Sequence, residues 1–198
     1  IGGLAGDALT TGAQNVVLGQ GALSADTKGN HSVALGRQAL SVQNFTTSTN
    51  TYNVAVGDRA GYQVTTGVQN TLIGGLSGDA ITTANNNVAV GYASLSGCQQ
   101  GALNVAVGVG ALQVANPSGA VDTYNTAVGF DAGNSVTTGT NNTLIGGIAG
   151  DALTGADFNV ALGQGALSAD TLGSRSTAIG RAALSAQNFT TATETYNT

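Results

Sequence analysis

Glycine recurs in this chain at a regular interval, and that interval limits the possible folds more than any other feature. Each of these glycines follows a short aliphatic run. They are Gly2, Gly19, Gly36, Gly57, Gly74, Gly91, Gly108, Gly129, Gly146, Gly163 and Gly180. Their sequence numbers rise by 17, 17, 21 and 17 in that recurring order, so four segments make one larger unit, 1–72 in the first instance. Such periods are too short for helix pairs, but they fit one coil of a β-solenoid.

Each segment carries one motif: Asn, then Val or Thr, usually Ala, a branched aliphatic residue and the glycine. It reads NVAVG at Asn53, Asn87 and Asn104, and serine replaces the asparagine at Ser32 and Ser176. The alternation of period two predicts a short strand with two distinct faces. We expect the larger aliphatic residues to stack inward as a core ladder that includes Val16, Leu18, Val54, Val56, Val88, Val90, Val105 and Val107.

The glycine after each strand predicts a structural corner, from Gly19 through Gly180 in the series above, with positive φ or close backbone approach. Each coil also offers one further core side chain. It lies four residues after the glycine (Leu23, Leu40, Leu95, Leu112) or seven residues after it (Leu9, Val64, Ile81, Val136, Leu153). The stacked asparagines are expected to form a hydrogen-bonded ladder at a turn.

Taken together, the repeats predict an all-β fold, a parallel β-solenoid or β-roll whose coils follow a 17-17-21-17 pattern. Residues 1–198 then form one repetitive segment, with units 1–72, 73–144 and a partial unit 145–198. Residues 1–54 and 145–198 are identical at 38 of 54 positions, about 70%. With no atypical capping repeat at either end, we expect a segment of a longer fibre. The four extra residues of each long coil, within 43–52 and 114–124, are expected to form outward loops.

The composition argues against several functions. With five Lys and Arg against ten Asp and Glu, the chain has no basic patch for nucleic acid. A single cysteine excludes an intrachain disulfide, and no apolar run is long enough to cross a membrane. No nucleophile stands beside a base, so we expect no enzyme activity, no cofactor and no metal.

A few polar residues are candidate sites. His31 is replaced by Arg175 two units later, which favours a surface role, and Cys98 is interpreted as a bystander thiol, with an interchain crosslink as the alternative. Asp7, Asp79 and Asp151 recur once in each unit, and turn capping is preferred over calcium binding because the GGxGxD spacing is missing. The threonine-rich segments 46–49 and 190–193 invite comparison with ice-binding faces, but such segments occur only in long coils.

The motifs at Ser32 to Gly36 and Ser176 to Gly180, with their NVAVG variants, resemble the YadA-like head repeats of trimeric autotransporter adhesins. Those heads typically use shorter coils, of about fourteen residues. The resemblance implies a parallel β-roll, a homotrimer, an extracellular or cell-surface location and an adhesive role toward a host-surface or matrix receptor. Similar arrays in phage tail fibres imply the alternative, a virion shaft that carries a distal receptor-binding tip. We expect the small residues opposite the aliphatic ladder, such as Ala89 and Ala106, to pack against the identical chains.

Overall fold

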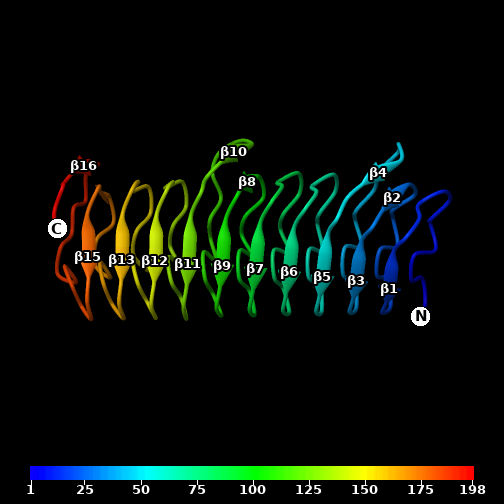
Figure 1. Cartoon of the computed structure of the whole chain (residues 1–198), viewed down its shortest axis with the longest axis horizontal. Coiled ribbons are helices and arrows are strands. Elements are labelled where there is room, and N and C mark those ends of the chain that lie inside the picture. The colour runs from blue at the N-terminus through cyan, green and yellow to red at the C-terminus, as the bar shows by residue number, and fades with distance from the viewer.

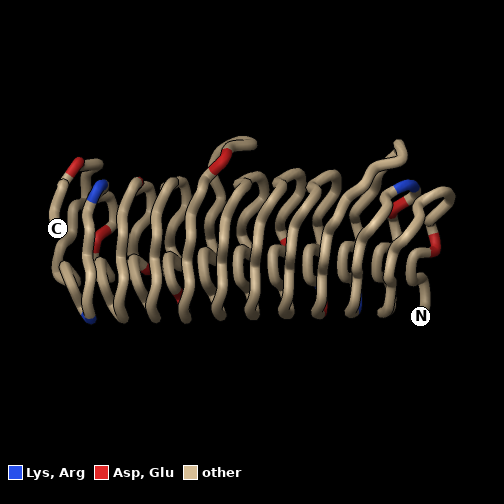
Figure 2. The backbone as a smooth tube through the Cα atoms, in the orientation of Figure 1, with Lys and Arg blue, Asp and Glu red and all other residues tan.

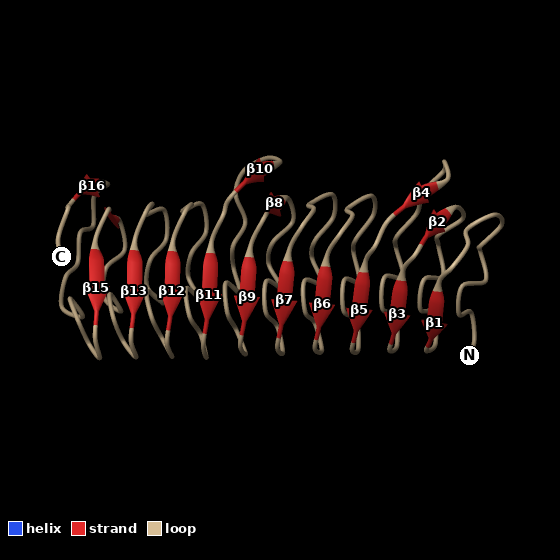
Figure 3. Ribbon diagram, viewed as in Figure 1, coloured by secondary structure: helices blue, strands red, loops and turns tan.

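The computed structural model describes all residues, 1–198, as a rod of stacked coils without a helix (Figure 1). The N-terminus and the C-terminus lie at opposite ends of the rod, and the chain advances along the axis by one coil at a time. Every strand pairing is parallel, and Figure 3 shows the strands aligned side by side with turns closing each coil. The predicted parallel β-solenoid is confirmed.

One ten-stranded sheet runs the length of the rod in the order β1-β3-β5-β6-β7-β9-β11-β12-β13-β15. Its strands are β1 (Val16–Leu18), β3 (Val33–Leu35), β5 (Val54–Val56), β6 (Thr71–Ile73), β7 (Val88–Val90), β9 (Val105–Val107), β11 (Thr126–Val128), β12 (Thr143–Ile145), β13 (Val160–Leu162) and β15 (Thr177–Ile179). The register aligns equivalent motif positions, so Ala89 pairs with Ala106 and Val90 with Val107. Each motif residue therefore stacks on its own counterpart in the next coil.

Three two-stranded sheets accompany the long coils. They pair β2 (Gly29–Asn30) with β4 (Thr49–Asn50), β8 (Gly101–Ala102) with β10 (Val121–Asp122), and β14 (Gly173–Ser174) with β16 (Thr193–Glu194). The extra residues stand out from the rod, most visibly at β10 in Figure 1. Residues 46–48 and 118–120 are exposed, so the predicted outward loops are confirmed.

The interior of the roll is built from the alanine face of the main sheet, which reverses the predicted orientation. Buried strand alanines are Ala34, Ala55, Ala89, Ala106, Ala127, Ala161 and Ala178. By contrast, Val16 and Leu18 are 55% and 47% exposed. Val54, Val56, Val88, Val90, Val105 and Val107 are only half-buried on that outer face. The predicted core ladder is therefore wrong, and so is the predicted trimer contact through the alanines.

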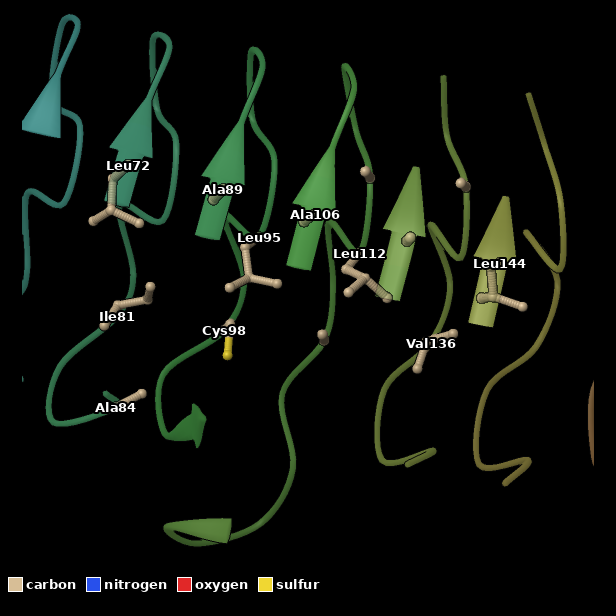
Figure 4. Packing of buried hydrophobic residues seen from close by; sticks show 14 of the residues in the cluster. Leu72, Ile81, Ala84, Ala89, Leu95, Cys98, Ala106, Leu112, Val136 and Leu144 are labelled. Carbon is tan, nitrogen blue, oxygen red and sulfur yellow. The ribbon is translucent and has the colours of Figure 1, made fainter. Parts of the chain in front are cut away.

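The reason for the reversal is the small space inside a single coil. The leucines four residues after the corner glycine, such as Leu95 and Leu112, are fully buried from the opposite wall, and Figure 4 shows them inside the same coils as Ala89 and Ala106. A close-packed interior this thin accommodates a leucine against an alanine, but not two facing rows of large side chains.

Coils that end in Ala-Gly or Ser-Gly fill the same space differently. In the coil that ends in Ser77-Gly78, Leu72 replaces the strand alanine and is fully buried, and Ile81, seven residues after the corner, is buried beside it. A Cβ added to Gly78 would lie 2.7 Å from Leu72 Cδ2 and 2.8 Å from Ile81 Cδ1. Glycine is therefore required there because the two aliphatic side chains occupy the space, and the predicted complementarity between the two coil types is confirmed.

The motif asparagines form the predicted ladder along a buried edge of the roll. Asn87 Oδ1 accepts a hydrogen bond of 3.0 Å from the backbone N–H of Asn104, and Asn70 Oδ1 accepts one from the backbone N–H of Asn87 in the same way. Asn87 Nδ2 donates to the carbonyl of Gly101 at 3.0 Å. Each asparagine thus satisfies backbone groups of the next coil that no strand pairing reaches.

The corner glycines lie directly after the strands with φ between +121° and +143°. At Gly57 a Cβ would lie 2.5 Å from the carbonyl oxygen of Gly74 in the next coil. Both the positive φ and the close approach of neighbouring coils exclude a side chain at this turn. The predicted structural corners are confirmed.

Candidate functional site

His31 and Cys98 are the only histidine and the only cysteine of the chain, and their surroundings differ from those of a catalytic residue. His31 stacks on the ring of Tyr52, with ring centroids 5.0 Å apart and planes 9° apart. Cys98 is buried, and its burial raises the pKa of the thiol to about 11. A buried, protonated thiol is a poor nucleophile and is out of reach of a second chain, which argues against the crosslink alternative.

The recurring aspartates lie half-buried or exposed on the side of the rod. Burial raises the pKa of Asp79, while Arg59 and the backbone N–H of Asp79 itself act in the opposite direction. Burial also raises the pKa of Asp151, and its buried Oδ1 has no hydrogen-bond partner. No three His, Cys, Asp or Glu side chains come together as metal ligands.

The outer face of the ten-stranded sheet runs along the rod from β1 to β15. It consists of the first and third residues of every strand, all of which are Val, Leu, Ile or Thr. None of these positions is charged, and Figure 2 shows the few charged residues of the chain scattered along the rod. Parallel sheets normally have both faces covered, so an apolar outer face of this length is unusual for an isolated chain.

A second surface feature is a column of residues in left-handed backbone conformation, one immediately before each motif Asn or Ser. Their φ angles lie between 50° and 64°. The column consists of Gln14, His31, Tyr52, Gln69, Asn86, Leu103, Tyr124, Asn141, Phe158, Arg175 and Tyr196. In the long coils the member is always tyrosine, and it adjoins the projecting loop.

A buried polar network fixes the root of the first projecting loop, and the sequence alone did not point to it. Asp26 Oδ1 accepts hydrogen bonds from the backbone N–H groups of Gly29 at 3.0 Å and Phe45 at 3.1 Å. Gln43 Nε2 donates to Asp26 Oδ2 at 2.6 Å. Asp170 and Gln187 repeat this arrangement in the third unit.

The second unit replaces this network with apolar residues. Cys98 stands where the other units have Asp26 and Asp170, and Ala115 stands where they have glutamine. Both Cys98 and Ala115 are buried. The joint change of the two positions was the signal in the sequence that could have identified the network.

The third unit has a cavity of about 220 Å³ where its long-coil loop meets the two preceding coils. It is lined by Asp157, Phe158, Ser174, Arg175, Ala192, Thr193 and Glu194. Ala192 and Thr193 belong to the threonine-rich segment compared with ice-binding faces, and Arg175 is the counterpart of His31. The sequence does not single out the other four lining residues as a site.

Arg175 is held in place at this cavity from three sides. Its guanidinium carbon lies 4.8 Å from the ring centroid of Phe158 and 5.7 Å from that of Tyr196. Its Nε lies 3.2 Å from Glu194 Oε1, and the hydroxyl of Tyr196 donates to Glu194 Oε2 at 2.7 Å. The hydrogen bond from Tyr196, together with Arg175, lowers the pKa of Glu194 from its ordinary value.

Asp157 supplies a second carboxylate to the cavity. Its Oδ1 accepts hydrogen bonds from the backbone N–H of Thr140 at 2.7 Å and from the Thr140 hydroxyl at 3.1 Å. Its own N–H donates to the hydroxyl of Ser174 at 3.0 Å. These bonds fix the side chain through Oδ1 and leave Oδ2 free to accept a hydrogen bond from a ligand.

Comparison of the chain with protein-family models, with curated proteins and with solved structures finds no match. The structure contains no helix of the length and apolarity needed to span a membrane.

Proposed function

We propose that this chain is a structural segment of an extracellular adhesive fibre, in which identical chains associate in parallel and form a rigid attachment surface. The observation that carries the proposal is the uncharged outer face of the ten-stranded sheet. Its aliphatic residues are half-buried or exposed in the single chain, as Val16, Leu18 and Leu162 are at 55%, 47% and 43%. A parallel sheet with such a face is suited to burial against another apolar surface.

A second copy of the same chain fits that face better than an unrelated partner does. Successive coils repeat the same two outward side chains, so a parallel copy in register repeats one contact at every coil. The face is only two side chains wide on each strand, which suits three narrow faces that meet at a common axis. Three copies are also what the resemblance to trimeric adhesin heads implies.

The interior supports a mechanical role. Backbone hydrogen bonds connect each coil to the next, and the asparagine ladder adds side-chain bonds at every step, as from Asn70 to Asn87 and from Asn87 to Asn104. Because each coil contacts only its neighbours, stiffness continues as far as the repeats do. The projecting loops recur once in every unit of four coils and supply surfaces that differ between units.

The association is tested by light scattering on the purified chain, coupled to size exclusion. We expect a mass three times the 19.3 kDa of one chain, about 58 kDa. The double variant Val90→Lys with Val107→Lys places charges on the outer face, and it is expected to be monomeric with an unchanged circular dichroism spectrum. The matched control, Thr66→Lys with Thr83→Lys, changes two exposed residues elsewhere on the coils and should remain trimeric.

A wild-type chain that is monomeric at all accessible concentrations would contradict the proposal. So would an association that persists unchanged in the Val90 and Val107 double variant, because the copies would then meet through another face.

A further inference from the structure

The cavity beside the third long coil lies where two nearly identical parts of the chain differ most. Residues 1–54 and 145–198 differ at 16 of 54 positions. Six of the seven residues that line the cavity are among those 16, whereas a proportional share would be about two. Some exposed positions elsewhere are kept, including the corner residues Gln164 and Arg181, which match Gln20 and Arg37, whereas others differ, as Val42 does from Ala186.

The same place therefore carries three different sets of side chains on one backbone. The first unit has Ala13, Gln14, Asn30, His31, Ser48, Thr49 and Asn50; the second has Asn85, Asn86, Ala102, Leu103, Ala120, Val121 and Asp122; the third has the seven residues of the cavity. Loop positions on a rigid frame vary readily, and binding residues are often found on such loops. A diversified set on an unchanged frame is typical of a surface that recognises ligands.

The charges at the cavity select the kind of ligand. The two carboxylates of Asp157 and Glu194 repel an anion, and the guanidinium of Arg175 repels a cation. A neutral molecule that both donates and accepts hydrogen bonds suits all three groups. Asp157 Oδ2 is available as an acceptor, and Arg175, which pairs with Glu194 through Nε, has two further nitrogens as donors.

The remaining lining completes the same chemistry. Ser174 and Thr193 add hydroxyl groups, and Phe158, which is 49% exposed, adds an aromatic ring for an apolar C–H surface. A volume of about 220 Å³ lies below the ~300 Å³ typical of sites for drug-sized ligands. The cavity therefore has room for one ring of a longer molecule. A sugar ring combines these properties: it is neutral, rich in hydroxyl groups and apolar on its C–H faces.

From these observations we infer that the cavity lined by Asp157, Phe158, Arg175 and Glu194 binds a neutral glycan, one sugar residue at a time. This inference rests on the proposed adhesive role, and it names the class of partner that the fibre contacts through this loop. Arg175 donates to ring or hydroxyl oxygens, Asp157 and Glu194 accept from hydroxyl groups, and Phe158 contacts the sugar's C–H face. The equivalent places in the other two units, with their different residues, do not bind the same sugar.

The test uses the full chain, fluorescently labelled, on an array of immobilised oligosaccharides. The array includes neutral glycans that end in glucose, galactose, mannose or N-acetylhexosamine, and sialylated and sulfated ones. The main variant gives the cavity the residues that stand at the equivalent positions of the first unit: Asp157→Ala, Phe158→Gln, Ser174→Asn, Arg175→His, Ala192→Ser and Glu194→Asn. Because these residues already fold together in the first unit, the variant is expected to fold. The single variants Asp157→Asn and Arg175→Gln test the same cavity with smaller changes.

We expect the wild-type chain to bind a subset of the neutral glycans, and the exchanged variant and both single variants to lose about tenfold or more in apparent affinity. Arg181→Ala changes an exposed arginine outside the cavity, and it should bind as the wild type does. The inference is overturned if the wild type binds no glycan, if it binds acidic glycans only, or if the exchanged variant binds equally well. Binding to an array of peptides that the exchange abolishes would overturn it in favour of a protein ligand.

The oligomeric mass of each labelled sample separates this inference from the proposed function. A trimer that binds no glycan contradicts the glycan site alone. A monomer that binds neutral glycans through this cavity contradicts the association of chains and leaves the site in place.

Discussion

Removal of one asparagine from the internal ladder is expected to destabilise the roll locally and strongly. In Asn87→Ala, the carbonyl of Gly101 keeps only the weak thiol donor of Cys98 at 3.4 Å, and two donors of Asn104, its backbone N–H and its Nδ2, lose their acceptor at 3.0 Å and 3.2 Å. These groups lie in the next coil at a buried edge from which water is excluded. A buried polar group without a partner costs about 1–3 kcal/mol, so the two donors together predict a loss of roughly 2–6 kcal/mol.

The assay has two parts, because a solenoid need not unfold in a single step. Urea unfolding followed by far-UV circular dichroism gives the change in midpoint. Hydrogen exchange, read by mass spectrometry on peptides that cover residues 101–104, shows whether protection is lost at the coil that depended on Asn87. Thr83→Ala is the matched control, since Thr83 lies in the same coil and is exposed.

The reasoning fails if Asn87→Ala unfolds at the midpoint of Thr83→Ala and exchange at residues 101–104 is unchanged. That result would mean that water replaces the side chain at this edge and that the ladder contributes little.

Three further predictions concern single positions. Gly57→Ala forces a Cβ to within 2.5 Å of the Gly74 carbonyl at a positive φ, so it should lower the unfolding midpoint clearly, whereas Gly3→Ala, which meets no atom within 4 Å, should not. Asp151 has a raised pKa in the folded chain, so the folded state favours the protonated form and the charged form costs stability at neutral pH. Asp151→Asn should therefore raise the melting temperature at pH 7, and this gain should vanish as the pH falls toward the ordinary aspartate pKa of 3.8; an equal gain at both pH values would contradict this. Cys98, with its thiol pKa near 11, should resist alkylation at neutral pH until the chain is unfolded, and rapid labelling of the native chain would show that the thiol is accessible.

The sequence predicted the coils well because the spacing of the corner glycines and the repetition of the motif can both be read from the order of the residues. A glycine at every 17th or 21st position defines the length of each turn, and the alternation of Val-Ala-Val defines a strand. The positions of Leu95 and Leu112 on the opposite wall were also predictable, since they keep a fixed distance from the glycine.

The direction of the strand faces was not predictable from hydrophobicity. Alternation identifies two faces but does not say which one points inward, and hydrophobicity favours the larger residues, such as Val90 and Val107, for the core. The deciding factor is the volume inside one coil, where leucines from the far wall leave room only for alanines such as Ala89 and Ala106. That volume depends on how the whole coil closes, and the sequence of a single strand carries no information about this.

The cavity of the third unit was missed for a different reason. Its residues come from three successive coils, far apart in the sequence, and none of them belongs to a recognisable motif. The signal was present as a difference between repeats, at Phe158 and Glu194 for example, where the first unit has Gln14 and Asn50. Only the structure shows that these differences gather around one loop.

The most direct test of the account is diffraction from oriented fibres or aligned films of the purified chain. Stacked parallel coils predict a strong reflection at about 4.8 Å along the long axis of the particle, and the unit of four coils predicts a repeat of roughly 19 Å in the same direction. If the reflection at about 4.8 Å instead lies perpendicular to the long axis, the strands run along the rod and the solenoid is contradicted.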